Sequence, residues 1–208
     1  MQTFKEEIKN NILKAAKNEF LKNGFEKASV RTIAANAKTS KSNVYNYFAD
    51  KDALFHAVVE PTVTIAQEGM VRLQSKNRQG NTYTIEAQKE VMSIFVRFAF
   101  DHSDNFKLLF IYSSGSSLSG FKNNLIESVA DALENWVKII APGRGLSRFF
   151  FCSVAGFYIS TIEQLIIGNT MIDQVSEHFG EFLKFVYGGW CNTLGISNHM
   201  GGEENHEV

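Results

Sequence analysis

The sequence predicts an all-α protein, and three observations lead to that prediction. Apolar residues recur at helical spacing along most of the 208 residues. Three polar residues suited to cap helices, Ser29, Ser40 and Asp50, follow one another too closely to leave room for a sheet. No stretch alternates convincingly between apolar and polar residues with the period of two that a half-buried strand requires.

Four helices are predicted in the first third of the chain. The first carries an apolar stripe and ends near Gly24, where glycine after Lys22 is a typical stop signal. The next three are expected at residues 30–37, 41–47 and 51–73. Pro61 falls inside the fourth helix and is expected to kink or break it, because proline removes one backbone hydrogen bond.

The rest of the chain is predicted to be helical too. A polar loop at 75–81 separates it from the first four helices, and the tail at 196–208 lacks apolar residues and should be disordered. The expected later helices lie at residues 83–101, 104–112, 118–140, 146–168 and 172–194.

Composition limits the class of protein. The hydrophobic content is 44% and the charged content 21%, which is ordinary for a globular protein with a buried core. No apolar run is expected to reach the length of a membrane span, and the first ten residues lack the apolar core of a secretory signal. The expected location is therefore the cytoplasm, with Cys152 and Cys191 as reduced, buried thiols.

The charges are distributed unevenly. Residues 1–56 carry ten Lys or Arg against six Asp or Glu, whereas the remainder carries eleven against sixteen. A basic front and an acidic back suit a protein whose front meets phosphate. A solvated helix surface would explain the charges equally well, so charge alone does not decide.

The stretch TIAANAKTSKSNVYNYF, residues 32–48, points to a function. It predicts a helix, a tight turn and a short second helix that begins at a capping serine, which is the layout of a helix-turn-helix. The second helix has a polar face on which asparagine can read adenine, and lysine or serine can reach guanine or phosphate. The candidate DNA-contacting residues are Ser29, Arg31, Thr32, Lys38, Ser40, Lys41, Ser42, Asn43, Tyr45, Asn46 and Lys51.

Residues 8–56 resemble the TetR family of bacterial transcriptional regulators. The matching pattern consists of Phe20, Gly24-Phe25, Ser29-Val30, Ile33-Ala34, Ser40-Lys41, Val44-Tyr45, Tyr47-Phe48, Lys51 and Leu54. The resemblance implies that Tyr45 lies along the DNA backbone, that Tyr47 packs inward and that Lys51 grips a phosphate. It also implies a helix-turn-helix domain at 1–50 and a helical effector-binding and dimerisation domain at 51–195.

The turn departs from the family pattern. Where the family usually carries Gly-Val before the capping serine, this chain has Lys38-Thr39. Lysine would have to adopt a positive φ there, at a cost of about 1 kcal/mol relative to glycine. Thr39 would place a hydroxyl where an apolar side chain normally packs.

The C-terminal part offers no specific motif. Thirteen of the eighteen phenylalanines lie beyond residue 56, and most are expected to form a helical core. By analogy with the family, some would line an effector pocket. Weak candidates for that pocket are Trp136, Tyr158, Gln164, Phe98 and Phe110. Glu163 is a further polar residue on the apolar helix expected at 146–168. It could face a cationic effector, but an exposed position on the edge of the helix is the simpler interpretation.

The last two long helices are apolar over more than one face, so a second copy of the chain is expected to cover them. The resemblance then implies a repressor that binds a palindromic double-stranded DNA operator as a homodimer and is released by a small effector. An alternative is a TetR-like protein that acts through a protein partner. No catalytic order of residues, metal spacing or phosphate-binding loop is visible, so neither enzyme activity nor a cofactor or metal is expected.

Overall fold

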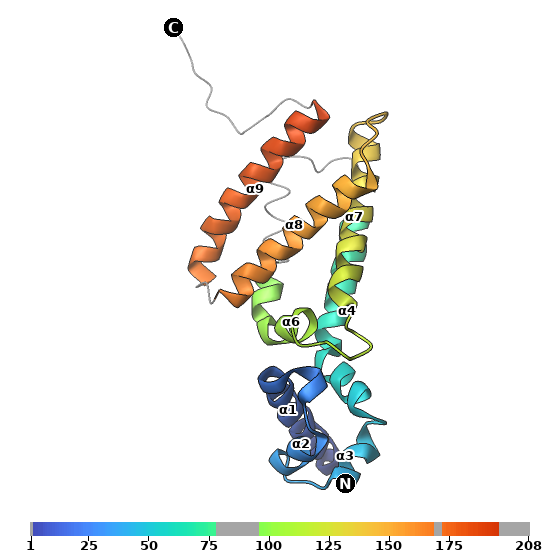
Figure 1. Ribbon diagram of the computed structural model, residues 1–208, viewed down its shortest axis with the longest axis vertical. Coiled ribbons are helices and arrows are strands. Elements are labelled where there is room, and N and C mark those ends of the chain that lie inside the picture. The colour runs from blue at the N-terminus through green and yellow to red at the C-terminus, as the bar shows by residue number, and fades with distance from the viewer. Residues whose placement is uncertain (1, 78–95, 169–171, 196–208) are drawn as a thin grey trace. The chain divides into compact units, whose positions relative to one another are not determined.

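The computed structural model describes residues 2–77, 96–168 and 172–195, and these ranges contain helices and turns but no strand, as predicted (Figure 1). The helices of the first part are α1 (Gln2–Lys27), α2 (Val30–Asn36), α3 (Lys41–Tyr47) and α4 (Lys51–Asn77). The later ones are α6 (Ser103–Phe110), α7 (Phe121–Ile140), α8 (Arg148–Ile167) and α9 (Ile172–Leu194). Of the helix expected at 83–101, residues 96–101 are described and helical, and the tail at 196–208 lies outside the described residues.

The chain forms two compact units. The first combines Met1–Gly69 with Asp101–Glu127, and the second combines Met70–Phe100 with Ser128–Val208. The first unit therefore holds α1, α2 and α3, most of α4, all of α6 and the start of α7. It extends beyond residues 1–50 because α6 packs on α1, and because the segment that follows α6 bonds to the end of α1.

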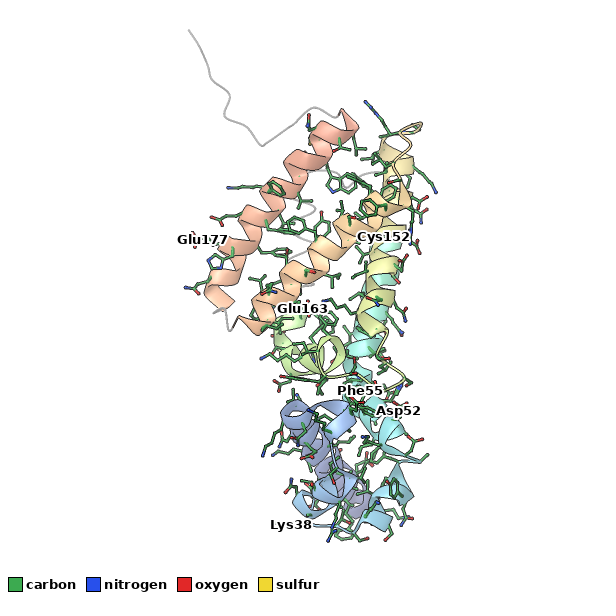
Figure 2. The ribbon with its side chains drawn as sticks, viewed as in Figure 1. Lys38, Asp52, Phe55, Cys152, Glu163 and Glu177 are labelled. Atoms are coloured by element: carbon green, nitrogen blue, oxygen red, sulfur yellow. The ribbon has the colours of Figure 1, made fainter. Side chains whose placement is uncertain are left out.

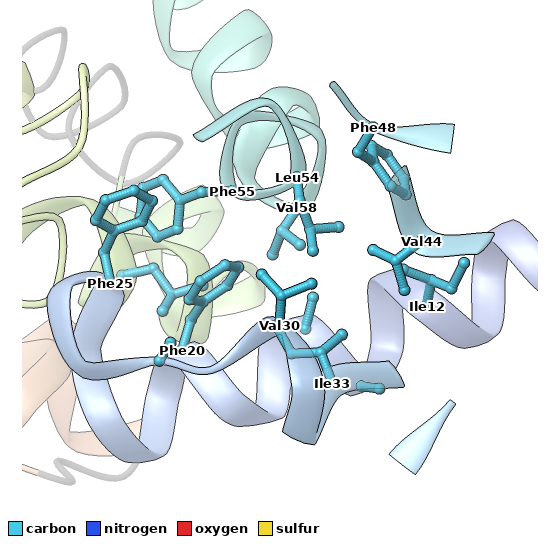
Figure 3. Packing of buried hydrophobic residues seen from close by; sticks show 14 of the residues in the cluster. Ile12, Phe20, Phe25, Val30, Ile33, Val44, Phe48, Leu54, Phe55 and Val58 are labelled. Carbon is cyan, nitrogen blue, oxygen red and sulfur yellow. The ribbon is translucent and has the colours of Figure 1, made fainter. Parts of the chain in front are cut away.

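Three phenylalanines form the centre of the first unit (Figure 3). The ring centroids of Phe20 on α1 and Phe55 on α4 lie 5.0 Å apart in an edge-to-face arrangement, and Phe25 lies 5.2 Å from Phe55. Phe20 and Phe55 are completely buried. Truncating one such ring to alanine typically costs about 3–5 kcal/mol, so this cluster fixes how α1 packs against α4.

Gly24 lets α1 change direction at this cluster. Its φ of 70° and ψ of 165° lie outside the helical range, in a region that glycine adopts without strain. The break frees the amide of Phe25, which donates to the carbonyl of Tyr112 at 2.8 Å. The stop predicted at Gly24 is thus where the helix turns, and the freed amide connects α1 to the segment after α6.

Pro61 does not break α4, so a break, one of the two expected effects of the proline, does not occur. The helix continues from Lys51 to Asn77 with Pro61 inside it. Buried Asn105 of α6 donates from Nδ2 to the Thr62 hydroxyl at 2.9 Å and to the Val58 carbonyl at 3.4 Å. These bonds and the burial of Val58, Val59 and Thr62 stabilise the helix on both sides of the proline.

The α2–α3 turn adopts the strained geometry that the resemblance implies. Lys38 has a φ of 54°, in the left-handed region that disfavours residues with a Cβ (Figure 2). The amide of Thr39 donates to the Ala34 carbonyl at 3.0 Å and closes the turn. The predicted caps also form: Ser40 accepts from the amide of Asn43 at 3.1 Å, and Asp50 accepts from that of Ala53 at 2.7 Å.

In the second unit, aromatic rings join α7, α8 and α9. Trp190 of α9 packs edge-to-face on Trp136 of α7 and on Phe150 of α8, with centroid distances of 5.1 and 5.5 Å. Phe157 of α8 and Phe182 of α9 pack at 4.8 Å. Cys152 and Cys191 are not joined in a disulfide, and Cys191 is buried whereas Cys152 is half-buried.

By length and composition, α8 could cross a membrane, which corrects the expectation that no run is long enough. The expectation failed because Glu163 is the only charged residue between Phe149 and Ile167. The core helix of a globular protein passes the same test of length and composition. The ring contacts of α8 with α9 fit that interpretation.

Asp52 ties the first turn of α4 to the segment between α6 and α7. Its carboxylate accepts from the Ser117 amide at 2.9 Å and from the Ser117 hydroxyl at 2.6 Å. His56 Nε2 lies 2.6 Å from the same hydroxyl and 3.8 Å from the carboxylate. One imidazole nitrogen faces both partners, so these three side chains lack the relay geometry of a catalytic triad.

The Asp52 contacts predict a pH-dependent stability. Burial raises the pKa of the Asp52 carboxyl, but the two Ser117 hydrogen bonds and the charge of His56 outweigh burial and hold the pKa below its ordinary value of 3.8. A lowered folded-state pKa stabilises the fold above the ordinary value, and this stability is lost as the pH falls through the folded value. We expect Asp52→Ala to lower the free energy of unfolding at pH 7, and the deficit to shrink below about pH 4. Urea titrations across this range measure it, with Ser117→Ala giving part of the same effect; a deficit that is constant with pH would contradict the assignment.

The Lys38 geometry predicts that Lys38→Gly raises the free energy of unfolding by about 0.5–1 kcal/mol. Glycine relieves the Cβ strain, although the greater entropy of its unfolded state offsets part of the gain. Lys38→Ala is the matched control, because it removes the same charged side chain and keeps the Cβ. Urea unfolding of the two variants compares them directly, and equal stability would show that the backbone is not strained at this turn.

Candidate nucleic-acid interface

Helix α3 is held by one side and leaves the other in solvent. Val44 is buried at 1% exposure, and Phe48, which follows the helix, is buried at 6%. Lys41, Ser42, Tyr45 and Asn46 are exposed on the opposite side. Apolar residues on one face and polar residues on the other fix the roll of the helix, so its polar side chains point away from the core.

The polar face of α3 carries a chain of side-chain hydrogen bonds. Asn43 donates from Nδ2 to the Thr39 hydroxyl at 2.7 Å. Asn46 donates from Nδ2 to Asn43 Oδ1 at 3.4 Å. Thr39 is half-buried at a position where the family usually packs an apolar side chain. Its hydroxyl is satisfied by the hydrogen bond from Asn43. The sequence pattern drew attention to Thr39 but did not predict this partner.

Lys41 and Tyr45 are neighbours one helical turn apart. The ammonium of Lys41 lies 5.7 Å from the centroid of the Tyr45 ring, within the range of a cation–π contact. The Tyr45 ring is 41% exposed. A cation beside an exposed ring with a hydroxyl provides both charge and a hydrogen-bonding group for a phosphate backbone.

Helix α2 supplies a second set of exposed polar groups. Ser29 caps it by accepting from the amide of Thr32 at 3.4 Å, and both Arg31 and Thr32 are exposed. The amide of Ser29 itself donates to the carboxylate of Glu19 at 3.1 Å, and Glu19 is 6% exposed. Sequence reasoning missed Glu19, although its position directly before the buried Phe20 on α1 is a signal that could have found it.

Lys51 has intramolecular partners. Its ammonium donates to the carbonyls of Glu26 at 3.1 Å and Ala28 at 3.4 Å, and lies 4.6 Å from the centroid of the Phe25 ring. Glu26 lies in the last turn of α1 and Ala28 directly after it, where a cation is favoured by the helix dipole. Lys51 therefore joins the first turn of α4 to the end of α1, and an ammonium has one further N–H to offer a phosphate.

All eleven predicted DNA-contacting residues lie in the first unit. They lie on α2 and α3, at the caps that precede these helices, on the turn between them, or, for Lys51, at the start of α4. Eight are exposed: Arg31, Thr32, Lys38, Ser40, Lys41, Ser42, Tyr45 and Asn46. Ser29, Asn43 and Lys51 are half-buried. Residues 28–49 hold ten of the eleven and contain no Asp or Glu, so this stretch combines cations and hydrogen-bonding groups without a carboxylate that would repel phosphate, whereas Lys51 lies between Asp50 and Asp52.

The predicted pocket residues do not share one environment. Trp136 and Tyr158 are buried in the second unit, Phe98 is half-buried there and Gln164 is exposed on α8. Phe110 belongs to the first unit, where it packs on Phe106 and Phe121 with centroid distances of 5.4 and 6.3 Å. Half-buried Glu163 also lies on α8 (Figure 2).

Two polar groups are enclosed by the aromatic rings of the second unit. Burial raises the pKa of the Tyr158 phenol to about 12, and the nearby indole of Trp190 opposes that rise. Trp190 Nε1 is buried, and no group among the described residues meets the geometry of a hydrogen bond to it. Sequence reasoning missed Trp190, whose place on the apolar side of α9 suggested only core packing.

Known proteins match the N-terminal region that holds α2 and α3. A family model for bacterial regulatory proteins of the tetR family matches residues 12–58. The HTH-type transcriptional regulator UidR of Escherichia coli strain K12 is 36% identical over 59 residues. That match spans 28% of this chain and 30% of UidR, so under a third of the relative's length is covered.

Solved structures extend the similarity of fold to most of the chain. A TetR-like transcriptional regulator from Rhodococcus sp. RHA1 superposes with a TM-score of 0.58 at 20% identity, over 88% of this chain and 96% of that one. The regulator FadR from Bacillus subtilis, solved in complex with stearoyl-CoA, gives a TM-score of 0.55 at 15% identity, over 83% and 96%. The N-terminal segment is thus similar to the tetR family model, and the solved structures show that the chain shares the all-α fold of such regulators.

Proposed function

We propose that the protein is a cytoplasmic repressor that binds a palindromic DNA operator as a homodimer and is released by a small effector. The observation that carries the proposal is the exposed polar face of α3, which includes Lys41 and lies opposite buried Val44 and Phe48. Two further exposed cations lie nearby in the sequence, Arg31 on α2 and Lys38 on the turn between α2 and α3. A short helix with a polar outer face suits the major groove, where side chains reach base edges. The flanking cations suit phosphate, which supplies most of the non-specific affinity.

Exposed aromatic residues on α8 and α9 support the proposed dimerisation through these helices. Phe149 and Phe185 are 80% and 72% exposed, and Phe157 is 47% exposed. Phenylalanine is seldom this exposed without a partner, and a second copy would cover these rings by packing α8 and α9 against their equivalents. Such a two-fold arrangement would place two copies of α3 about 34–36 Å apart, the spacing of half-sites one helical turn apart.

The second unit is the proposed effector domain. Its buried Trp136, Tyr158 and Trp190 supply apolar surface with few polar groups, the composition typical of small-molecule sites. That the similarly folded FadR was solved with stearoyl-CoA supports a largely apolar effector. An effector would release the DNA only through different affinities for the DNA-binding and released states. Because α4 contributes residues to both units, it is the proposed route of that coupling.

Lys41→Ala tests the interface. Because Lys41 is exposed on α3, its loss should weaken binding to all DNA sequences and lower the slope of log K against log salt by about one. Lys138→Ala is the matched control: it removes the same charge from α7, where Lys138 is 66% exposed and paired with Glu134. Fluorescence anisotropy with duplexes from the protein's own upstream region, at several salt concentrations, measures both variants.

The outcomes separate the proposal from its alternative. Salt-sensitive and sequence-selective binding that Lys41→Ala weakens and Lys138→Ala preserves would support a DNA-binding repressor. Equal losses in both variants would assign the effect to net charge and remove α3 from the interface. Binding that is weak, equal for upstream and scrambled duplexes and insensitive to salt would favour a protein that acts through a protein partner.

A further inference from the structure

We propose that Thr39 is a positioning residue for base selection: its hydroxyl holds the Asn43 amide in one orientation and thereby sets which base α3 prefers. This inference rests on the proposed function and deepens it. Thr39 itself lies before α3 and is half-buried, so its effect passes through Asn43. The 2.7 Å bond from Asn43 Nδ2 to Thr39 Oγ1 is the observation that carries it.

The backbone fixes the Thr39 hydroxyl before any DNA arrives. Lys38 takes the left-handed conformation, and the Thr39 amide donates to the Ala34 carbonyl at 3.0 Å. Ser40 then accepts from the Asn43 amide at 3.1 Å and fixes the first turn of α3. Threonine has a stiff χ1, so the hydroxyl has little freedom once the backbone is set.

The bond to Thr39 decides what Asn43 can offer to a base. An asparagine amide has two N–H donors and an oxygen with two lone pairs. Asn43 uses one donor on Thr39 and one lone pair on Asn46, which leaves one donor and one lone pair. A donor and an acceptor side by side are what adenine N7 and N6 require.

Without Thr39, the Asn43 amide would be free to turn over. The terminal torsion of asparagine is broad and roughly two-fold, so a turned amide exchanges donor and acceptor at little cost. In the structure, Asn43 Oδ1 accepts a hydrogen bond from Asn46 Nδ2. Turning the Asn43 amide over would place its N–H groups against this Asn46 donor, so the bond would be lost and Asn46 would also be released. Both asparagines would then select bases less sharply, while the contacts of Lys41 and Tyr45 would stay as they are.

Three variants test the inference. Thr39→Val removes the hydroxyl and keeps the side-chain shape, Thr39→Ser keeps the hydroxyl, and Asn43→Ala removes the amide that Thr39 holds. Each full-length protein selects from a duplex library with a randomised central segment, and sequencing gives base preferences position by position. Thermal melting of each variant checks folding, and Thr39→Ala replaces Thr39→Val if the valine is not tolerated.

We expect Thr39→Val to lower the preference for adenine about fivefold at the position where Asn43→Ala also lowers it, which corresponds to the loss of one hydrogen bond. Thr39→Ser should select the same sequence as the unmodified protein. Unchanged selection by Thr39→Val, or a loss only at positions that Asn43→Ala leaves intact, would overturn the positioning role. If the unmodified protein selects no sequence at all, the proposed DNA-binding function fails, and this result is distinct from either of the others.

Discussion

The packing of Phe20 and Phe25 against Phe55 is the constraint on which the rest of the first unit depends. These rings join α1 to α4 and are almost completely removed from solvent. The helix α4 begins three residues after Phe48, and its first residue Lys51 binds the carbonyls of Glu26 and Ala28 at the end of α1. The packing of α1 against α4 therefore also constrains where α3 ends. The polar face of α3 is therefore oriented by a buried apolar cluster on the opposite side of the helix, and its side chains can specialise for recognition at little cost in stability.

Polar contacts add direction to this apolar core. The Gly24 break lets the Phe25 amide reach Tyr112, Asp52 binds Ser117, and Asn105 binds Thr62. Each bond connects the part of the unit that carries α2 and α3 to α6 or to the segment after it. A change in α6 would thus have several routes to the interface, each of which requires a specific hydrogen bond to break or form.

Local rules of sequence accounted for the caps at Ser29, Ser40 and Asp50, which depend on a few neighbouring residues. The positive φ at Lys38 was expected from the resemblance, because the family usually carries glycine there. Partners distant in sequence could not be predicted in this way. The contact of Lys51 with Glu26 spans 25 residues, and that of Asp52 with Ser117 spans 65. The helix α4 continues through Pro61, next to the hydrogen bond from Asn105 of α6 to Thr62, so a rule based on proline alone did not predict this continuity. The pocket residues stay a prediction, since aromatic composition identifies buried rings without specifying which of them surround a ligand.

The most direct measurement is a hydroxyl-radical footprint of the protein on a duplex that it selects. If two copies of α3 enter successive major grooves, the footprint should show two protected segments whose centres lie about 10 base pairs apart on one face of the duplex. Lys41→Ala should weaken both segments equally, because a two-fold dimer makes each contact twice. A single protected segment, or uniform weak protection along the duplex, would contradict a dimer that reads DNA through α3.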